Sequence, residues 1–316
     1  MASRYRSMNP LARRRFLQAA AVAVCTAGCA RVARLMEPAV EHQADPARFV
    51  GGPPVPGEML RDPVTVTWIG HSTFLIRLDG TTILTDPLFG SRIGIRLAGS
   101  ITVGPSRLVP PAVPMGDLPP VDLVLLSHAH MDHYDLASIR RLERDVPVIF
   151  AHDTTEFIEG FDFTSVQELD WAQTAQVKGV RVEALPVRHW GKRYPWDRDR
   201  GYNGYLLTKG RHALFFAGDT ADTDQIAPRL AGRRLDAAFF PIGSYNPWIF
   251  NHASPEEAWR MFRALDARAF VPMHWRTFKL SKEPTFEPME RLRAVAGPLA
   301  DRIALDHIGQ TWTLKS

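Results

Sequence analysis

The chain has 316 residues, 45% of them apolar, which is enough to bury a sizeable core as one large domain or as two fused halves. Residues 1–28 hold five of the 38 basic residues and no acid, so the rest of the chain carries about 33 basic against 34 acidic residues and shows no basic run that would mark a nucleic-acid groove. The two cysteines, Cys25 and Cys29, both lie near the N-terminus, so a metal in the body must be held by histidine and carboxylate.

The first thirty residues are typical of a targeting segment. An arginine cluster precedes an apolar stretch of about a dozen residues, which is shorter than the ~20 needed to span a bilayer. Residues 13–17 (RRRFL) resemble a twin-arginine export signal, and Thr26 to Cys29 resemble a lipoprotein processing site. We therefore expect an export signal at 1–30, a linker at 31–63, and a protein that is periplasmic or attached to the membrane through Cys29. An unprocessed basic tail is the alternative.

Beyond a proline- and glycine-rich stretch at 49–63, the chain alternates between strand-like and helix-like segments, and we expect one domain over 64–316. One helix is well signalled, because Ser254, Pro255 and Glu257 form a cap, a first turn and a capping box before an apolar pattern. Hairpin-like strand pairs precede the helical stretches, which predicts an α/β fold of four layers, an αββα sandwich. The predicted strands are 64–69, 73–78, 82–85, 121–127, 147–151, 180–187, 203–208, 212–217, 236–240, 268–272 and 311–314.

A dense group of possible metal ligands follows the short apolar run at 121–126. The stretch 125–135 (LLSHAHMDHYD) places His128, His130, Asp132 and His133 on the loop at the C-terminal end of a predicted buried strand. Three other predicted strands are followed at once by a ligand-type residue; these are His189, Asp219 and His274.

Seven such residues suit two ions that share a carboxylate. A single histidine or aspartate after a strand is often only a satisfied polar residue or a turn cap. The H-x-H-x-D-H block is different, because burying it without a metal would leave several polar groups unpaired at roughly 1 to 3 kcal/mol each.

The block and the later ligands resemble the metallo-β-lactamase fold. That resemblance implies two zinc ions: His128, His130 and His189 would hold one, Asp132, His133 and His274 the other, and Asp219 would bridge them. A closer likeness, to the N-acyl-phosphatidylethanolamine-hydrolysing phospholipase D group and its bacterial relatives, implies phosphodiester hydrolysis of phospholipid-type substrates. It rests on the stretches 67–89, 185–193, 215–220, 241–247, 254–260 and 273–278.

Asp132 and three further residues have predicted roles in proton transfer or in orienting the ligands. Two zinc ions lower the pKa of a shared water to near neutrality, and the leaving alcohol then needs a proton. We expect Asp132, acting through the activated water, or His252 to relay it; His252 could instead bond to backbone near the helix that follows. His71 and Asp86 are predicted to orient ligands from outside the ligand set, a role that the resemblance supports better for Asp86. Either could instead stabilise a turn.

Aromatic and basic residues near the ligand loops are predicted to contact the substrate. They are Trp190, Lys192, Arg193, Tyr245 and Trp248. Such a mixture suits an acyl chain with a phosphate, or a surface that rests on a membrane, while ordinary loop packing is the alternative. Arg276, close behind a ligand, and the insert at 197–203 leave the head-group preference open.

The ligands do not distinguish a phosphodiesterase from a lactone, ester or amide hydrolase. The alternative that is not an enzyme is an exported protein of the cell envelope that binds metal without catalysis.

Overall fold

The computed structural model describes residues 62–97 and 101–314, which form two large sheets and one hairpin. The predicted export signal, its arginine cluster, Cys29 and nearly all of the predicted linker lie outside these residues. The seven-stranded sheet has the order β15-β1-β2-β3-β6-β7-β8. Its strands are β1 (Val64–Gly70), β2 (Thr73–Leu78), β3 (Thr81–Thr85), β6 (Leu123–Leu126), β7 (Val148–Ala151), β8 (Val166–Leu169) and β15 (Thr311–Thr313).

The second sheet has six strands in the order β14-β13-β12-β11-β10-β9. Its strands are β9 (Thr174–Val177), β10 (Val180–Leu185), β11 (Gly204–Lys209), β12 (His212–Phe216), β13 (Ala237–Pro241) and β14 (Ala269–Met273). A separate hairpin joins β4 (Ile95–Leu97) to β5 (Ile101–Val103).

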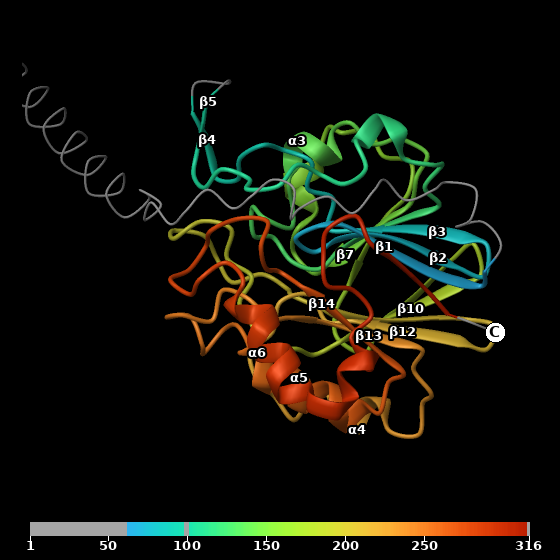
Figure 1. Ribbon diagram of the computed structural model, residues 1–316. Coiled ribbons are helices and arrows are strands. Elements are labelled where there is room, and N and C mark those ends of the chain that lie inside the picture. Colours follow the sequence, from blue (N-terminus) through green and yellow to red (C-terminus); the bar gives the residue numbers. More distant parts are fainter. Residues whose placement is uncertain (1–61, 98–100, 315–316) are drawn as a thin grey trace, which may run out of the picture. The chain divides into compact units, whose positions relative to one another are not determined.

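The two large sheets pack face to face over one continuous apolar core. Phe74 of the first sheet meets Phe239 of the second edge to face, with ring centroids 5.0 Å apart. The outer face of the second sheet is covered by helices (Figure 1), and Trp259 and Phe262 pack there against Phe270. These helices are α4 (Ile226–Leu230), α5 (Pro255–Leu265) and α6 (Glu287–Ala296).

The outer face of the first sheet has a thinner cover. A smaller apolar cluster there packs strand residues such as Val124 and Leu126 against Tyr134, Ile139 and Phe161. The short helical elements on this side are α3 (Leu136–Ile139), η2 (Met115–Asp117) and η3 (Thr155–Ile158). A last turn, η4 (Gly297–Arg302), follows α6. The layering is thus helix, sheet, sheet, helix, which confirms the predicted αββα sandwich.

All eleven predicted strands are present within a few residues, and α5 begins as predicted. The Ser254 side chain accepts from the amide of Glu257, and the Glu257 carboxylate accepts from the amide of Ser254 at 2.8 Å. The missed strands are β4, β5, β8 and β9. The last two are largely exposed, and their sequences VQEL and TAQV carry too few apolar residues for a strand signal. None of the helices within 62–97 and 101–314 is long and apolar enough to cross a bilayer.

The parallel parts of both sheets determine where the loops gather. In the first sheet β3, β6, β7 and β8 run parallel, and in the second β12, β13 and β14 do. Parallel strands present their carboxyl ends at one edge, where loops are held by a rigid framework. The predicted ligands follow β6, β10, β12 and β14.

Candidate metal centre

Four donors after β6, β10 and β12 form a first group. They are His128, His130, His189 and Asp219, whose ligand-type atoms all lie within 4.8 Å of one another. His130 Nδ1 lies 2.8 Å from His128 Nε2 and 3.2 Å from His189 Nε2. Residues up to 61 positions apart in the chain therefore present three ring nitrogens to one point.

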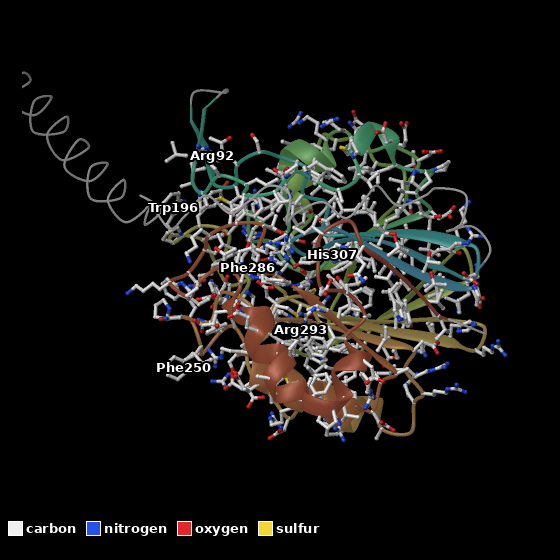
Figure 2. The ribbon with its side chains drawn as sticks, in the orientation of Figure 1. Arg92, Trp196, Phe250, Phe286, Arg293 and His307 are labelled. Atoms are coloured by element: carbon white, nitrogen blue, oxygen red, sulfur yellow. The ribbon has the colours of Figure 1, made fainter. Side chains whose placement is uncertain are left out.

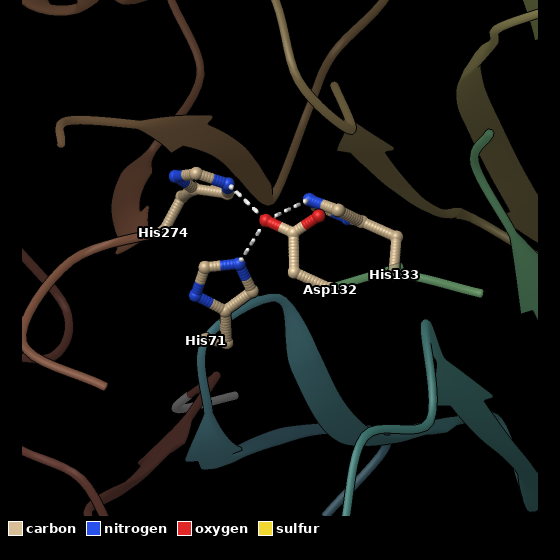
Figure 3. A group of neighbouring side chains, drawn as sticks. All are labelled: His71, Asp132, His133 and His274. Carbon is tan, nitrogen blue, oxygen red and sulfur yellow. Dashed lines mark hydrogen bonds and ion pairs between the residues drawn. The ribbon is translucent and has the colours of Figure 1, made fainter. Parts of the chain in front are cut away.

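A second group contains Asp132, His133, His274 and also His71 (Figure 3). Asp132 Oδ2 lies 3.0 Å from His71 Nε2, 3.2 Å from His274 Nε2 and 3.7 Å from His133 Nε2. The sequence predicted His71 outside the ligand set. The structure brings its nitrogen among the donors, at the turn between β1 and β2, and its ring centroid lies 4.1 Å from that of His274.

Asp219 stands between the two groups. Its Oδ2 lies 3.1 Å from both His133 Nε2 and His274 Nε2 in the second group. The same oxygen lies 3.7 Å from His189 Nε2 and 3.9 Å from His128 Nε2 in the first. One carboxylate oxygen thus faces four ring nitrogens, which is the arrangement expected of a bridging ligand.

Three observations show that these residues fit metal ions. First, both Asp219 oxygens and His133 Nε2 are buried without a hydrogen-bond partner among the described residues, a costly arrangement that a cation would resolve. Second, the donor separations of 2.8 to 3.9 Å bracket the ~3.3 Å edge of a tetrahedron with bonds of about 2.0 to 2.1 Å. Third, the far nitrogens of several histidines are hydrogen-bonded.

Those outer hydrogen bonds select the tautomer that a ligand needs. His189 Nδ1 donates to the carbonyl of Asn251 at 2.9 Å, and His133 Nδ1 donates to Asp86 Oδ2 at 2.7 Å. Ser127 Oγ donates to Asp86 at 2.7 Å and can therefore accept from His128 Nδ1 at 2.9 Å. In the neutral form of all three histidines, the site-facing Nε2 carries the lone pair that a metal would bind.

Asp86 therefore supports one ligand in each group. It is fully buried, and its second oxygen also accepts from the amide of Ser127 at 2.7 Å. The predicted supporting role matches this placement. Ser127 was missed by the sequence prediction, although a hydroxyl directly before the first histidine of the block was a usable signal.

In the metal-free protein, burial lowers the pKa values of the site histidines, whereas neighbouring carboxylates raise them. Burial lowers the pKa of His130 to about 4, and burial together with the neighbouring His274 lowers the pKa of His71 to about 3. Burial alone would lower the pKa of His274 too, but the carboxylates of Asp219 and Asp132 raise it to about 9. The second group thus holds protons in the absence of a metal, and metal binding must displace them.

His252 and Trp190 line the first group. His252 Nδ1 is buried 3.8 Å from Asp219 Oδ2, and its ring lies 5.1 Å from those of both His189 and His274. Trp190 is half-buried, with its ring 4.5 Å from that of His130 and 6.0 Å from that of His252. Both residues therefore lie directly beside the donor groups.

Arg193 has a role that the sequence did not predict. Its Nη1 donates to the carbonyl of Ala129 at 2.8 Å and to that of Tyr134 at 2.9 Å, and its guanidinium lies over the Phe157 ring. Ala129 sits between two ligands and Tyr134 follows the last one. Arg193 thus holds both ends of the ligand loop, a role that the sequence did not predict; its predicted contact with the substrate stays a prediction.

The other predicted contact residues face different surroundings. Tyr245 is buried and bonds to Glu287 at 2.8 Å, so its hydroxyl is already engaged. Lys192 pairs with the exposed Asp199, and Trp248 is about half exposed. These two remain available to a ligand at the rim.

The insert at 197–203 is an ordered part of the loop that carries Trp190. Arg200 is buried and bonds to both oxygens of Asp197 at 2.8 Å, and it also pairs with Glu156 of η3. Arg276, which follows the ligand loop after β14, places its guanidinium 5.4 Å from the Phe286 ring centroid.

Comparison with known proteins places this geometry in a family. The pattern described as the beta-lactamase superfamily domain matches residues 81–275, which is more than half of the chain and holds all seven predicted ligands. The chain belongs to this superfamily. The predicted metallo-β-lactamase fold is thereby confirmed, and with its two donor groups the protein is a metal-dependent hydrolase of the superfamily. The resemblance to the phospholipase D group is confirmed by relatives of that name that are 33% and 29% identical to this chain.

Individual relatives agree with the assignment. An uncharacterised protein of Mycobacterium tuberculosis is 36% identical over 259 residues, covering 78% of this chain and 68% of its own length. The mitochondrial N-acyl-phosphatidylethanolamine-hydrolyzing phospholipase D of Saccharomyces cerevisiae is 33% identical over 265 residues, covering 79% of this chain but only 56% of the yeast protein. The solved structure of Igni18, a novel metallo hydrolase from Ignicoccus hospitalis, has a TM-score of 0.60 at 21% identity, over 80% of this chain and 99% of that one.

Proposed function

We propose that this superfamily member is a dinuclear zinc phosphodiesterase of the phospholipase D type, acting on lipids similar to N-acyl-phosphatidylethanolamine. The observation that carries the two-metal proposal is Asp219, whose Oδ2 lies within 3.9 Å of four ring nitrogens from both donor groups. The substrate proposal is supported by the yeast relative, which is named for this activity.

In this reaction the oxygen of water bonds to phosphorus, and the bond from phosphorus to the head-group alcohol breaks. The bound ions would supply an activated water and would stabilise negative charge on the phosphoryl oxygens. His252 can take a proton from the attacking side and return it to the leaving alkoxide, because its ring lies beside ligands of both groups. Asp132 is the second candidate for this relay.

The surroundings of the site support a lipid substrate. Trp190 forms an apolar wall over the first group, and the stacked rings of Tyr194 and Trp196 stand on the same loop with centroids 5.4 Å apart. Trp248 is another half-exposed aromatic, on the loop that leads to His252. Aromatic rings of this kind suit acyl chains and the membrane interface.

One kinetic comparison tests the reaction type. Wild-type protein should turn over N-acyl-phosphatidylethanolamine and a simple aryl phosphodiester, and an acyl-homoserine lactone should be a poor substrate. A preference for the lactone, with both phosphodiesters untouched, would replace the phosphodiesterase by a carbonyl hydrolase. A fully metal-loaded protein that turns over none of the three would favour the non-catalytic alternative.

A second comparison tests the proton relay. His252→Gln should slow the lipid, whose alkoxide leaving group needs a proton, by about 10²- to 10⁴-fold. A nitrophenyl phosphodiester has a leaving group that is stable without a proton, so it should be affected far less. Equal losses on the two substrates would remove His252 from the relay.

The proposed location of the protein is outside the cytoplasm. Replacing Arg13 and Arg14 by lysine should retain the precursor in the cytoplasm, and Cys29→Ala should prevent lipid attachment. Fractionation that finds the unmodified full-length chain soluble in the cytoplasm would contradict export.

A further inference from the structure

The hairpin of β4 and β5 belongs to neither large sheet. Its register pairs Ile95 with Val103 and Leu97 with Ile101, whereas Arg96 pairs with Thr102. Paired apolar positions thus alternate with a basic and polar pair. Within the described residues these two strands pair only with each other, and Figure 1 shows them extending away from the sheets. A two-stranded ribbon cannot bury an apolar face by itself.

Two glycines mark where the hairpin leaves the body. Gly94 and Gly104 both have positive φ, and a Cβ on Gly94 would lie 2.1 Å from the carbonyl oxygen of Val103, so no side chain fits. Burial changes across this point. Ile93, on the body side, is 6% exposed, whereas Ile95 and Val103 on the other side are 38% and 43% exposed.

The base of the hairpin is firmly attached near the second donor group. Ile93 packs with Leu88 and Phe278, and Phe278 lies edge to face with His71 at 5.5 Å. Arg107 donates to the carbonyl of Gly90 at 2.9 Å, and its guanidinium lies over the Phe278 ring. The hairpin is therefore attached to the body beside the second donor group.

The charge of this region indicates which kind of surface would bind the exposed pair Ile95 and Val103. The thirty residues 87–116 contain Arg92, Arg96 and Arg107 and no acidic residue. A second copy of the arm would bring like charges together, whereas a bilayer that contains anionic lipid offers both apolar depth and the opposite charge. Two other strongly exposed aromatics, Trp196 at 76% and Phe250 at 74%, lie along the same side as Arg92 in Figure 2.

We propose that the hairpin docks on the surface of an anionic bilayer, with Ile95 and Val103 entering the interface and the exposed Arg92 lying at the lipid phosphates. The proposal rests on the lipid substrate proposed above, since docking would bring the metal site to that substrate. Gly94 and Gly104 allow the chain to turn away from the body, which places Ile95 and Val103 at the exposed surface.

The test is sedimentation of the full-length, metal-loaded chain with neutral phosphatidylcholine vesicles and with vesicles that also contain phosphatidylglycerol. The double variant Ile95→Asp with Val103→Asp should bind the anionic vesicles at least about tenfold more weakly than wild type. Val166→Asp is the matched control, because Val166 is similarly exposed, at 45%, on strand β8 at the edge of the first sheet, and it should bind like wild type. Turnover of a soluble aryl phosphodiester should be the same in all three.

A probe on the arm makes the test independent of the N-terminal segment. An environment-sensitive dye on Ile95→Cys, in a chain with Cys25→Ala and Cys29→Ala, should shift to the blue with anionic vesicles, and the same dye on Val166→Cys should not. Unchanged emission at position 95 would overturn the proposal. So would sedimentation equilibrium that shows a dimer which the double aspartate variant dissolves.

These outcomes separate the docking surface from the proposed activity. Wild-type protein that docks through the hairpin but hydrolyses no phosphodiester would leave the docking intact and refute the proposed function. The opposite result is protein that hydrolyses the lipid in micelles although neither the hairpin variants nor the dye at position 95 changes its behaviour with vesicles. It would refute the docking and leave the proposed function intact.

Discussion

Removing Arg193 should loosen the whole ligand loop. Its guanidinium makes two hydrogen bonds, to the carbonyls of Ala129 and Tyr134, and lies 5.2 Å from the Phe157 ring centroid. Hydrogen bonds from a charged donor contribute about 1.5 to 3 kcal/mol each when buried, and the ring contact about 0.5 to 1. Because the side chain is only partly buried, we expect Arg193→Ala to lower the free energy of unfolding by about 2 to 4 kcal/mol.

The effect should also appear in metal binding. Changes in residues that orient metal ligands typically weaken affinity by about 10- to 100-fold, and this loop carries ligands of both groups. Urea unfolding and competition with a chelator measure the two quantities. Lys192→Ala is the control, because its exposed pair with Asp199 contributes about 0 to 1 kcal/mol.

A different result would return Arg193 to the role that the sequence predicted. If Arg193→Ala kept its stability and both metal affinities, and only the KM for an anionic phosphodiester rose, the guanidinium would be a substrate contact. Arg193→Lys gives a second check. A lysine keeps the charge but cannot reproduce the geometry of a guanidinium, so a structural role predicts a clear loss of stability in this variant as well.

The other predictions concern the metal site itself. If the chain binds the two metals proposed above, Asp219→Ala should lose at least one of them and nearly all activity, and elemental analysis showing unchanged content would contradict the bridge. Asp86→Asn should weaken both metals by about 10- to 100-fold, and chelator titration showing only one weakened site would contradict shared support. Without metal, the pKa of about 4 for His130 and for His252 means that stability is lost as the pH falls from 6.5 towards 4. The raised pKa of His274, about 9, means that its contribution is lost as the pH rises from 6.5 towards 9, so urea unfolding at pH 5, 6.5 and 8.5 should show the highest stability in the middle, and a flat profile would refute this.

The sequence predicted the parts of the fold and site that local patterns determine. Buried strands with dense apolar residues were all identified, and so was the capping box at Ser254. The polar edge strands β8 and β9 were not, because their positions depend on pairing with neighbours rather than on their own composition. The seven predicted ligands do come together, since all lie on loops that follow strands held by the sheets.

The sequence did not allow us to predict side chains that bond to backbone groups far away in the chain. Arg193 bonds to carbonyls 59 and 64 positions away, and carbonyl groups leave no trace in a residue pattern. His71 illustrates a second limit. Its distance from Asp132 in space is set by the turn between β1 and β2, so residue type alone could not show whether it orients a ligand or joins the ligand set.

The centre is assembled at the expense of the metal-free protein's stability. His71, Asp86 and His274 all have positive φ, at 56°, 34° and 62°, a backbone conformation that costs non-glycine residues about 1 kcal/mol or more each. Both oxygens of Asp219 are buried without a hydrogen bond from the described residues. Such strain persists only where the surrounding structure imposes it. Here the buried ends of β6, β10, β12 and β14 fix the loops that carry the predicted ligands. Metal ions would satisfy these carboxylate oxygens, so in this fold metal-binding energy acts as folding energy, and the same seven side chains that would hold the ions would also draw the two sheets together.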